Sequence, residues 1–398
     1  MSLLDLLPEE SCWDKFYDYK LSLIGSKKFV KELDDYIKER RYLCVCDTIR
    51  EGGAFPLPKK SVISKTGSDK KRTVYVYPKD ETTALKMLTY LMLRKYDHLF
   101  SRGLYSFRPG RTAKDAVRML LKKKELSQMY SYKADIHDYF NSIPVGLLLP
   151  RLKEAIFDDM PLYEFLSSLL LEERVIDRGN IIKEKKGIMA GTPQSSFFAN
   201  LFLSELDRHF EDAGVIYARY SDDIILFAES RGEVEGHAAY IKEFLKENGL
   251  TVNPSKESYT APGEPFTFLG FVCCGDKADI APVTLKKLKN KMRRKRDALV
   301  RWSKRNEIDP EKAAKAFIRI FNRKLLERPE DNELSWGAWF FPVINTTKSL
   351  HEIDLYAQDC LRYIISGKHT KSRYNVRYDD LKSLGYKSLV NAYHKDPE

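Results

Sequence analysis

The sequence "RYSDDIILFA", residues 219–228, sets Asp222 and Asp223 side by side between two runs of strand-forming residues. The pattern predicts a β-hairpin with the two aspartates at its tip. Adjacent carboxylates repel each other, and each prefers to be solvated or paired with a cation. The stretch alone fits two interpretations, a solvated turn or part of a site for a divalent cation. A third carboxylate elsewhere in the chain would favour the cation site.

Asp135 is the candidate for that third carboxylate. It lies in "MYSYKADIHDYFNSIP", residues 129–144, which begins as an alternating strand with aromatic residues on one face and Asp135 on the polar face. We therefore expect a strand that is buried on one face only. A lone aspartate at a strand end is commonly a cap or turn residue. Together with Asp222 and Asp223, however, it would complete a two-Mg²⁺ site, with Mn²⁺ as a substitute, of the kind that displaces pyrophosphate in line.

The composition describes a folded, water-soluble chain with room for two or three subdomains. Of the 398 residues, 43% are hydrophobic and 31% are charged. No apolar run approaches the roughly 18 residues that span a bilayer, and residues 1–13 do not read as a signal peptide. The six cysteines form no CxxC pair, which argues against a zinc site or a disulfide framework. These features predict a protein that resides in a reducing cytoplasm and does not associate with a membrane.

Most of the net charge of +11 lies in one segment. Residues 281–305 contain eleven Lys or Arg and the single acid Asp297. Apolar residues recur there at three-to-four spacing or its multiples, which predicts a helix with one buried stripe formed by Leu285, Leu288, Met292, Leu299 and Trp302. A solvated amphipathic helix, a membrane-surface helix and a nucleic-acid contact all fit a basic face. We favour nucleic acid because one sign of charge is so concentrated and the stripe lacks bulky inserting residues.

The rest of the chain alternates strands and helices. Thr192 is a candidate N-cap with Pro193 at the first helical position, so we expect a helix to begin there. The preceding stretch from residue 177 to residue 191 reads as a loop. The pattern predicts an α+β body of about 270 residues, followed by a basic, mostly helical C-terminal region. The other expected elements are helices at 81–100, 145–175 and 233–249 and strands at 73–77, 250–259 and 266–274.

Six segments together resemble the reverse transcriptases, and within them the bacterial group II intron, retron and phage-defence enzymes. Each match is weak alone, but the six stand in the family's order. They are the finger-like "KRTVYVYP" and "YSFRPGRTAKDAV", the palm-like "KADIHDYFNSIP" and "GIMAGTPQSSFFANLFLSELD", the "RYSDDIILFA" box with the following "GLTVNPSKE", and the primer-grip-like "FTFLGF".

The resemblance implies a right-hand polymerase fold with fingers, a palm built on an antiparallel sheet, and a basic helical thumb. We expect the N-terminal extension and fingers over residues 1–129. The palm would cover residues 130–276, with a finger insertion at about 146–186. The thumb and a C-terminal extension would follow over residues 277–398.

The resemblance also assigns roles to individual residues. Asp135, Asp222 and Asp223 would hold the metals, and Lys256 would neutralise the departing pyrophosphate. Phe140, five residues after Asp135, would exclude a ribose 2′-hydroxyl. The incoming dNTP would further meet Lys71, Arg72 and Gln194. Contacts to the RNA template and the DNA product are expected from Tyr220, Lys287, Lys291, Arg293, Arg294 and Arg296.

The implied function is an RNA-directed DNA polymerase that copies a dedicated non-coding RNA in bacterial antiphage defence. A retron or group II intron type enzyme, an RNA-directed RNA polymerase and a non-catalytic maturase-like scaffold are the alternatives. Phe140 argues against ribonucleotide synthesis, and three clustered aspartates argue against a scaffold. Ser221 and the pair Ser195–Ser196 depart from the family pattern. The template's identity, the priming mode and the oligomeric state do not follow from the sequence.

Overall fold

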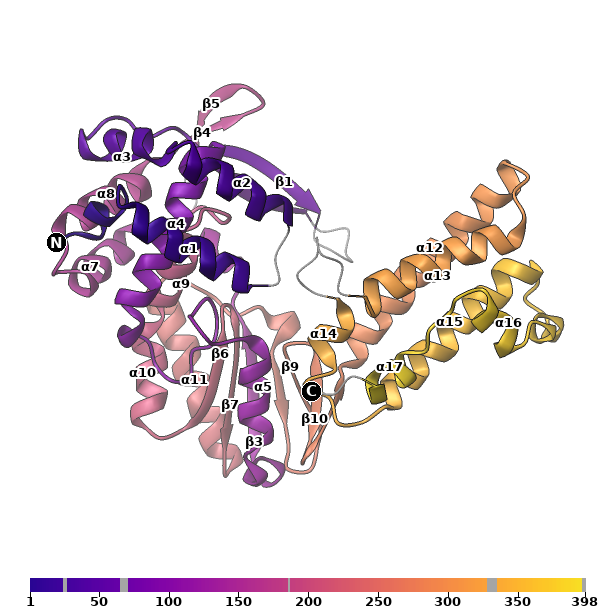
Figure 1. The fold of residues 1–398 in the computed structure, drawn as a ribbon. Helices are drawn as coiled ribbons and strands as arrows, with labels where there is room; N and C mark the ends of the chain where they lie inside the picture. Colours follow the sequence, from indigo (N-terminus) through magenta and orange to yellow (C-terminus); the bar gives the residue numbers. More distant parts are fainter. Residues whose placement is uncertain (24–26, 65–70, 185–186, 328–334, 396–398) are drawn as a thin grey trace. The chain divides into compact units, whose positions relative to one another are not determined.

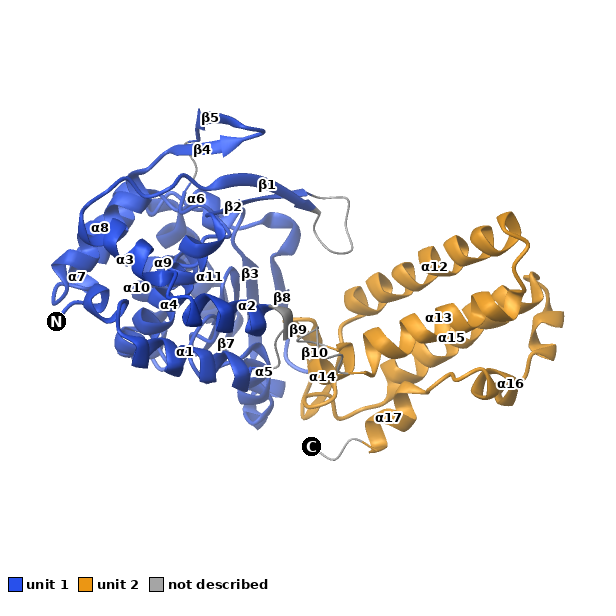
Figure 2. Ribbon diagram, turned by 45° about the horizontal axis from the view of Figure 1, so that its top comes forward, with its two compact units in different colours: residues 1–23, 27–264 blue, residues 24–26, 265–398 orange. Residues whose placement is uncertain are grey.

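The computed structural model describes residues 1–23, 27–64, 71–184, 187–327 and 335–395. Two compact units divide the chain, and Figure 2 colours them separately. Unit 1 comprises residues 1–23 and 27–264, and unit 2 begins at Pro265. The division therefore precedes residue 276, and the expected palm and thumb boundaries remain a prediction.

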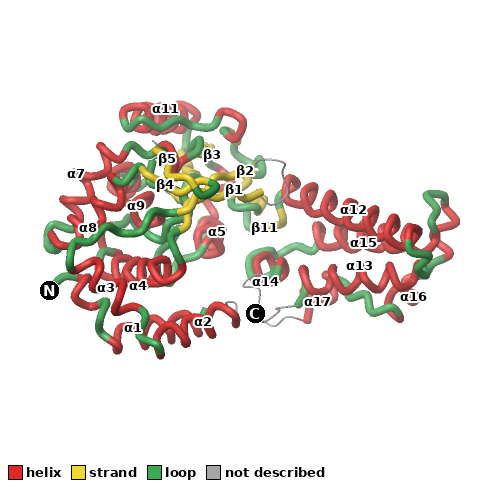
Figure 3. The backbone as a smooth tube through the Cα atoms, turned by 90° about the horizontal axis from the view of Figure 1, so that it is seen from above, coloured by secondary structure: helices red, strands yellow, loops and turns green. Residues whose placement is uncertain are grey.

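Unit 1 is organised around an antiparallel four-stranded sheet in the order β6-β7-β3-β8. Helices α10 and α5 pack against β6, and α11 packs against β3 and β7. In Figure 3, α11 lies on one side of the strands of unit 1 and α1, α2 and α4 lie on the other. The strands are β3 (Tyr130–Asp135), β6 (Ile216–Tyr220), β7 (Asp223–Ala228) and β8 (Ser258–Thr260), and the helices are α5 (Ala113–Leu121), α10 (Ser204–Asp212) and α11 (Arg231–Glu247).

A second sheet in unit 1 has the order β2-β1-β4-β5. Strand β1 pairs antiparallel with β2 and parallel with β4, which continues into β5 by a hairpin. The strands are β1 (Lys59–Ser64), β2 (Lys71–Val76), β4 (Arg174–Asp177) and β5 (Asn180–Lys183). The remaining helices are α1 (Glu10–Ser22), α2 (Lys27–Lys38), α3 (Tyr42–Arg50), α4 (Lys79–Lys95), α6 (Tyr139–Ser142), α7 (Val145–Ala155), α8 (Met160–Leu171) and α9 (Ser195–Phe202).

Unit 2 combines a small sheet with a helical bundle (Figure 1). The sheet has the order β11-β10-β9, and α12, α13 and α15 pack pairwise against one another. The elements are β9 (Phe266–Phe268), β10 (Phe271–Cys274), β11 (Lys277–Ile280), α12 (Pro282–Arg305), α13 (Pro310–Leu325), α14 (Trp336–Phe340), α15 (Lys348–Ser366), α16 (Tyr378–Ser383) and α17 (Leu389–Lys395). No helix among the described residues of either unit is long and apolar enough to cross a membrane.

Strand β3 corrects the expectation that one of its faces is exposed. Asp135 on the expected polar face is only 2% exposed, and Ser131 on that face is also buried. The reason is tertiary: β3 lies between β7 and β8, and Asp135 is covered by its contacts with Asn253 and Lys256 while Ser131 bonds to Thr260. An alternating strand at the centre of a sheet can therefore carry buried polar residues when those residues find partners.

Other local expectations were also wrong, among them the strand at 250–259, of which only Ser258 and Tyr259 belong to β8. The expected loop at 177–191 contains strand β5, because its residues pair with β4. Helix α9 begins at Ser195 rather than at Pro193, because Thr192 accepts no capping bond and its hydroxyl donates to Met189 O instead. On α12, Trp302 is 43% exposed and Ser303 takes the buried position at that turn.

Candidate active site

The three aspartates meet where β3, β6 and β7 come together. Asp135 ends β3 and Asp223 begins β7, and the two residues are direct partners across the antiparallel pair. Directly opposed residues send their side chains to the same face of a sheet, a few ångströms apart. Asp222 lies in the turn just before β7, and its carbonyl accepts a 3.0 Å bond from the N–H of Ile136. The structure thus brings together the three carboxylates that the sequence predicted.

A buried hydrogen-bond network holds the turn that carries Asp222. Ser221 adopts φ 60°, a left-handed conformation that a serine rarely takes without support. Its N–H donates to Ser106 Oγ at 2.9 Å, and its carbonyl accepts from Arg219 Nη1 at 3.1 Å. Arg219 is fully buried and pairs with buried Asp207 through its Nε at 2.7 Å. These bonds fix the backbone on which Asp222 and Asp223 are presented.

Burial and mutual repulsion disfavour the charged forms of these carboxylates. Burial, followed by the charge of Asp135, raises the pKa of Asp222. Burial, followed by the charge of Asp222, raises the pKa of Asp223 from 3.8 to about 6. Perturbed carboxylates gathered at one point are typical of a functional site. A divalent cation would remove the repulsion that produces these shifts.

Lys256 provides the positive charge that faces the carboxylates in the protein alone. Its ammonium forms an ion pair with Asp135 Oδ2, and Asn253 Nδ2 donates to Asp135 Oδ1 at 3.3 Å. Burial would lower the pKa of Lys256, but the bond to Asp135 and the charges of Asp223 and Asp222 outweigh it and raise the pKa. Lys256 thus contacts Asp135 directly, and its predicted role toward pyrophosphate remains a prediction.

The chemistry of the carboxylates fits Mg²⁺. Carboxylate oxygens are the ligands that Mg²⁺ and Mn²⁺ accept, and burial raises the pKa of both Asp222 and Asp223. Within the described ranges, no group of three His, Cys, Asp or Glu side chains is already positioned as a metal site. The ion pair between Lys256 and Asp135 accounts for part of this, because it engages an oxygen that a cation would need.

Arg72 and Phe140, two residues predicted to meet the dNTP, lie in contact with each other. The Arg72 guanidinium carbon lies 5.6 Å from the centroid of the Phe140 ring. Arg72 and Lys71 belong to β2 and are exposed, and Phe140 belongs to α6, which follows Asp135 directly. A cation over a ring and beside carboxylates can meet a triphosphate while the ring meets the sugar.

Gln194 lies elsewhere than an exposed template contact would require. Its side chain is 2% exposed and its Nε2 donates to Leu85 O at 3.5 Å. It lines a small interior cavity together with Tyr77 and Phe198. No described contact joins it to the aspartates, so its predicted role in dNTP binding has no support in this arrangement.

Two glycines of "GIMAG" let the loop from 187 to 191 pass between α6 and β2, a constraint that the sequence reading missed. A Cβ on Gly187 would lie 2.3 Å from Phe140 O, and a Cβ on Gly191 would lie 3.1 Å from Tyr75 O. Both glycines also have positive φ, of 29° and 104°. The loop thereby braces the backbone of Phe140, whose carbonyl accepts from Ile188 N at 3.0 Å.

Phe107 is a further candidate that sequence reasoning missed. It is 40% exposed and has φ 57°. Its ring centroid lies 6.3 Å from Phe140 and 6.5 Å from Tyr220, so the three rings form a row beside the aspartates. An exposed aromatic residue in a strained backbone conformation indicates a functional position, and the motif "YSFRPG" alone did not single out Phe107.

The predicted basic residues of α12 do not all have the same surroundings. Lys287, Lys291, Arg293 and Arg294 are exposed, as a phosphate contact requires. Arg296 is instead engaged within unit 2: it pairs with Asp297 at 2.7 Å and its guanidinium carbon lies 4.8 Å from the Tyr363 ring centroid. We therefore expect less from Arg296 than the sequence suggested.

Comparison with known proteins settles the family. The family model described as "Reverse transcriptase (RNA-dependent DNA polymerase)" matches residues 57–273, which is more than half of the chain and includes all three aspartates. The chain belongs to the reverse transcriptase family. The predicted α+β polymerase fold class is thereby confirmed, with its antiparallel sheet and its helical C-terminal region.

Individual reverse transcriptase relatives are distant. The chain is 25% identical over 162 residues to the retron Ec86 reverse transcriptase of Escherichia coli, covering 40% of this chain and 47% of that protein. It is 26% identical over 159 residues to an uncharacterised 91 kDa protein in the cob intron of Schizosaccharomyces pombe, covering 39% of this chain and 19% of that protein. The match thus spans about half or less of each relative. The expected likeness to retron reverse transcriptases is confirmed.

Among solved structures, similarity extends over more of the chain but is weak. The telomerase of Candida albicans, in complex with the TWJ fragment of telomeric RNA, is 13% identical with a TM-score of 0.47. That match covers 86% of this chain and 66% of the telomerase chain.

Proposed function

We propose that the protein is an RNA-directed DNA polymerase that extends a 3′-hydroxyl with dNTPs. The observation that carries the proposal is the pairing of Asp135 with Asp223 across β3 and β7, with Asp222 in the adjoining turn. It lies within the segment that matches the reverse transcriptase family. Two Mg²⁺ ions held by these carboxylates would activate the 3′-hydroxyl and stabilise the departing phosphate oxygens.

The chain's own residues supply the rest of the site. Arg72 would pair with the triphosphate, and Phe140 would sit where a ribose 2′-hydroxyl would otherwise fit. Lys256, which faces Asp135 in the protein alone, would balance negative charge that builds up as pyrophosphate leaves. The aromatic row that ends at Tyr220 would contact the primer end. The contact of Lys256 with Asp135 and the contact of Arg72 with Phe140 support these roles.

The experiment is incorporation of labelled dNTP on an RNA template annealed to a DNA primer. We expect Mg²⁺-dependent DNA synthesis by the wild type and its loss, by at least about a thousandfold, in Asp222→Asn. Incorporation of rNTP in place of dNTP would favour an RNA polymerase. Absence of any synthesis, with retained RNA binding, would favour a maturase-like scaffold. The matched control is Asp18→Asn, an exposed aspartate of α1.

We further propose that the template is a dedicated non-coding RNA and that the DNA product serves antiphage defence in the bacterial cytoplasm. The likeness to a retron reverse transcriptase and the concentration of basic residues on α12 support this proposal. Sequencing the RNA and DNA that copurify with wild type and with Asp222→Asn tests the template. One RNA should predominate in both preparations, with complementary DNA only in the wild type. Phage plating on cells that carry either form tests the defence role, and equal plating would contradict it.

A further inference from the structure

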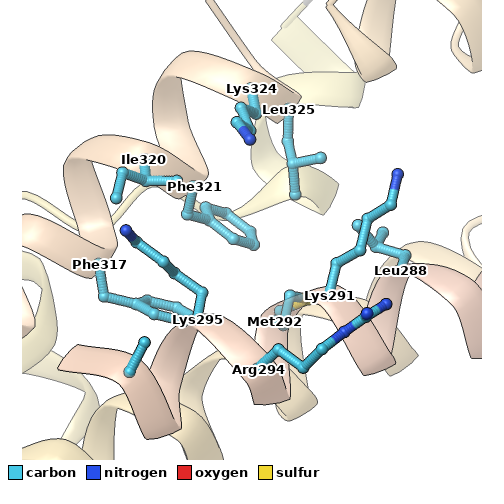
Figure 4. Close-up of a pocket in the computed structure, with 11 residues that line it drawn as sticks. Leu288, Lys291, Met292, Arg294, Lys295, Phe317, Ile320, Phe321, Lys324 and Leu325 are labelled. Atoms are coloured by element: carbon cyan, nitrogen blue, oxygen red, sulfur yellow. The ribbon is translucent and has the colours of Figure 1, made fainter. Parts of the chain in front are cut away.

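A groove between two helices of unit 2 combines an apolar floor with a basic rim. It lies between α12 and α13 and has a volume of about 480 Å³, within the range of ligand sites in proteins. Phe317 and Phe321 of α13 direct their rings toward α12, as Figure 4 shows. Met292 completes the floor from the α12 side.

The rim carries four cations and no acid. Lys291, Arg294 and Lys295 come from α12, and Lys324 comes from α13. Burial, followed by the charges of Lys324 and Arg294, lowers the pKa of Lys291. None of the four forms an ion pair with another described residue. Mutually repelling cations around a cavity are a site for an anion.

The lack of ion pairs around the groove is not shared by every cation of α12. Toward α15, Lys289 pairs with Glu352 at 2.5 Å. Arg296 pairs with Asp297 and lies over the Tyr363 ring. Lys289 and Arg296 are therefore neutralised within unit 2, whereas none of the four cations that face the groove has an acidic partner among the described residues.

We propose that this groove binds one unstacked nucleotide of a single-stranded segment of the RNA partner. The base would lie against Phe321 and Phe317, and the flanking phosphates would pair with Lys291 and Lys324. A base within a duplex is stacked between its neighbours and cannot enter a cavity between two helices, so the segment must be single-stranded. The inference rests on the proposed function, because it names the part of the RNA that unit 2 holds.

The test uses the full chain and two fluorescent probes of twelve units. One is oligo(rU), and the other is an abasic strand with the same phosphates and no bases. The wild type should bind oligo(rU) about tenfold more tightly than the abasic strand, because base stacking on an aromatic side chain is the main difference between them. Phe321→Leu, which keeps an apolar floor but removes the π face, should bring the ratio close to one.

Charge is tested separately on the surface, where folding is not at risk. Lys291→Gln with Lys324→Gln should weaken both probes alike and lower the slope of log affinity against log salt by about 1.4, at about 0.7 for each phosphate on a single strand. The matched control is Lys304→Gln with Lys312→Gln, which removes two exposed cations of α12 and α13 outside the groove. The control should leave the preference for oligo(rU) unchanged and lower the slope less.

Four results would overturn the inference. The first is that the wild type binds oligo(rU) and the abasic strand equally tightly, and the second is that an RNA duplex competes with oligo(rU) as well as a single strand does. The third is that the charge variant and its control lose the same amount of affinity and salt slope. The fourth is that a polyglutamate peptide displaces oligo(rU) as effectively as unlabelled RNA does. The last would identify an acidic protein segment as the occupant. Incorporation of dNTP on a preformed template–primer, measured in parallel, separates the two proposals: inactivity with an intact base preference would refute only the polymerase.

Discussion

The ionised carboxylate of Asp223 should lower the free energy of unfolding of the metal-free protein at neutral pH. Asp223→Asn should remove this destabilisation. Burial and the neighbouring charge of Asp222 raise the pKa of Asp223 from 3.8 to about 6. At about 1.4 kcal/mol for each pKa unit, the ionised group costs about 3 kcal/mol of unfolding free energy. Asparagine has nearly the same shape and carries no charge, so the variant should be more stable by up to about this amount.

The sign of the pH dependence follows from the same shift. A carboxyl group with a raised pKa in the folded state holds its proton more tightly when folded. Its penalty is absent below about pH 4, grows as the pH rises through 6, and is complete above that. Asp223→Asn should therefore match the wild type near pH 4 and exceed it at pH 7.5.

Urea unfolding of the full chain in EDTA, near pH 4 and at pH 7.5, measures the difference in unfolding free energy between the wild type and Asp223→Asn. Asp18→Asn, on the exposed surface of α1, is the control and should change little at either pH. Adding Mg²⁺ should raise the stability of the wild type more than that of Asp223→Asn, because a cation that binds only the folded state stabilises it. If Asp223→Asn is no more stable than the wild type at pH 7.5 in EDTA, the carboxylate is not under electrostatic strain and the reasoning fails.

Three other changes test separate parts of the molecule. Phe140→Ala should retain DNA synthesis and gain ribonucleotide incorporation, and an unchanged dNTP-to-rNTP ratio would mean that the ring is only packing. Arg219→Gln should lower the unfolding free energy by about 3 to 5 kcal/mol, because it leaves Asp207 buried and unpaired; adding Asp207→Asn should then cost little more. Arg293→Gln with Arg294→Gln should reduce the salt slope of nucleic-acid binding by about 1.4 to 1.8, and a constant slope would show that this face of α12 is merely solvated.

The sequence carried enough information to place the aspartates because β-structure has a strict period. The alternation in "MYSYKAD" and the hairpin pattern of "RYSDDIILFA" each specify a strand, and opposite ends of paired strands bring Asp135 beside Asp223. The same local rules placed the basic helix almost to the residue, since α12 begins at Pro282. Local periodicity was least informative where tertiary contacts decide, as for β5, which exists only because β4 is there to pair with it.

Burial of polar residues was the main feature that local patterns could not show. Ser106 and Arg219 lie far apart in sequence, and each reads as an ordinary surface residue of its own segment. Only the fold reveals that both bond to Ser221, one to its N–H and one to its carbonyl. Ser221 had stood out as a departure from the family pattern. These bonds hold both of its backbone groups and so support the left-handed turn, but they do not explain why a serine stands there.

The buried hydrogen bonds to Ser221 and the positive charge of Lys256 both act on Asp222 and Asp223. A chain that places three carboxylates together must hold the backbone against their repulsion, and buried Arg219, paired with Asp207 and bonded to Ser221, provides that restraint. Lys256 offsets part of the same repulsion from the other side through Asp135. The bonds to Ser221 and the charge of Lys256 therefore act together to hold the three aspartates close to one another. The proposed two-metal chemistry would use carboxylates whose backbone is held in this way.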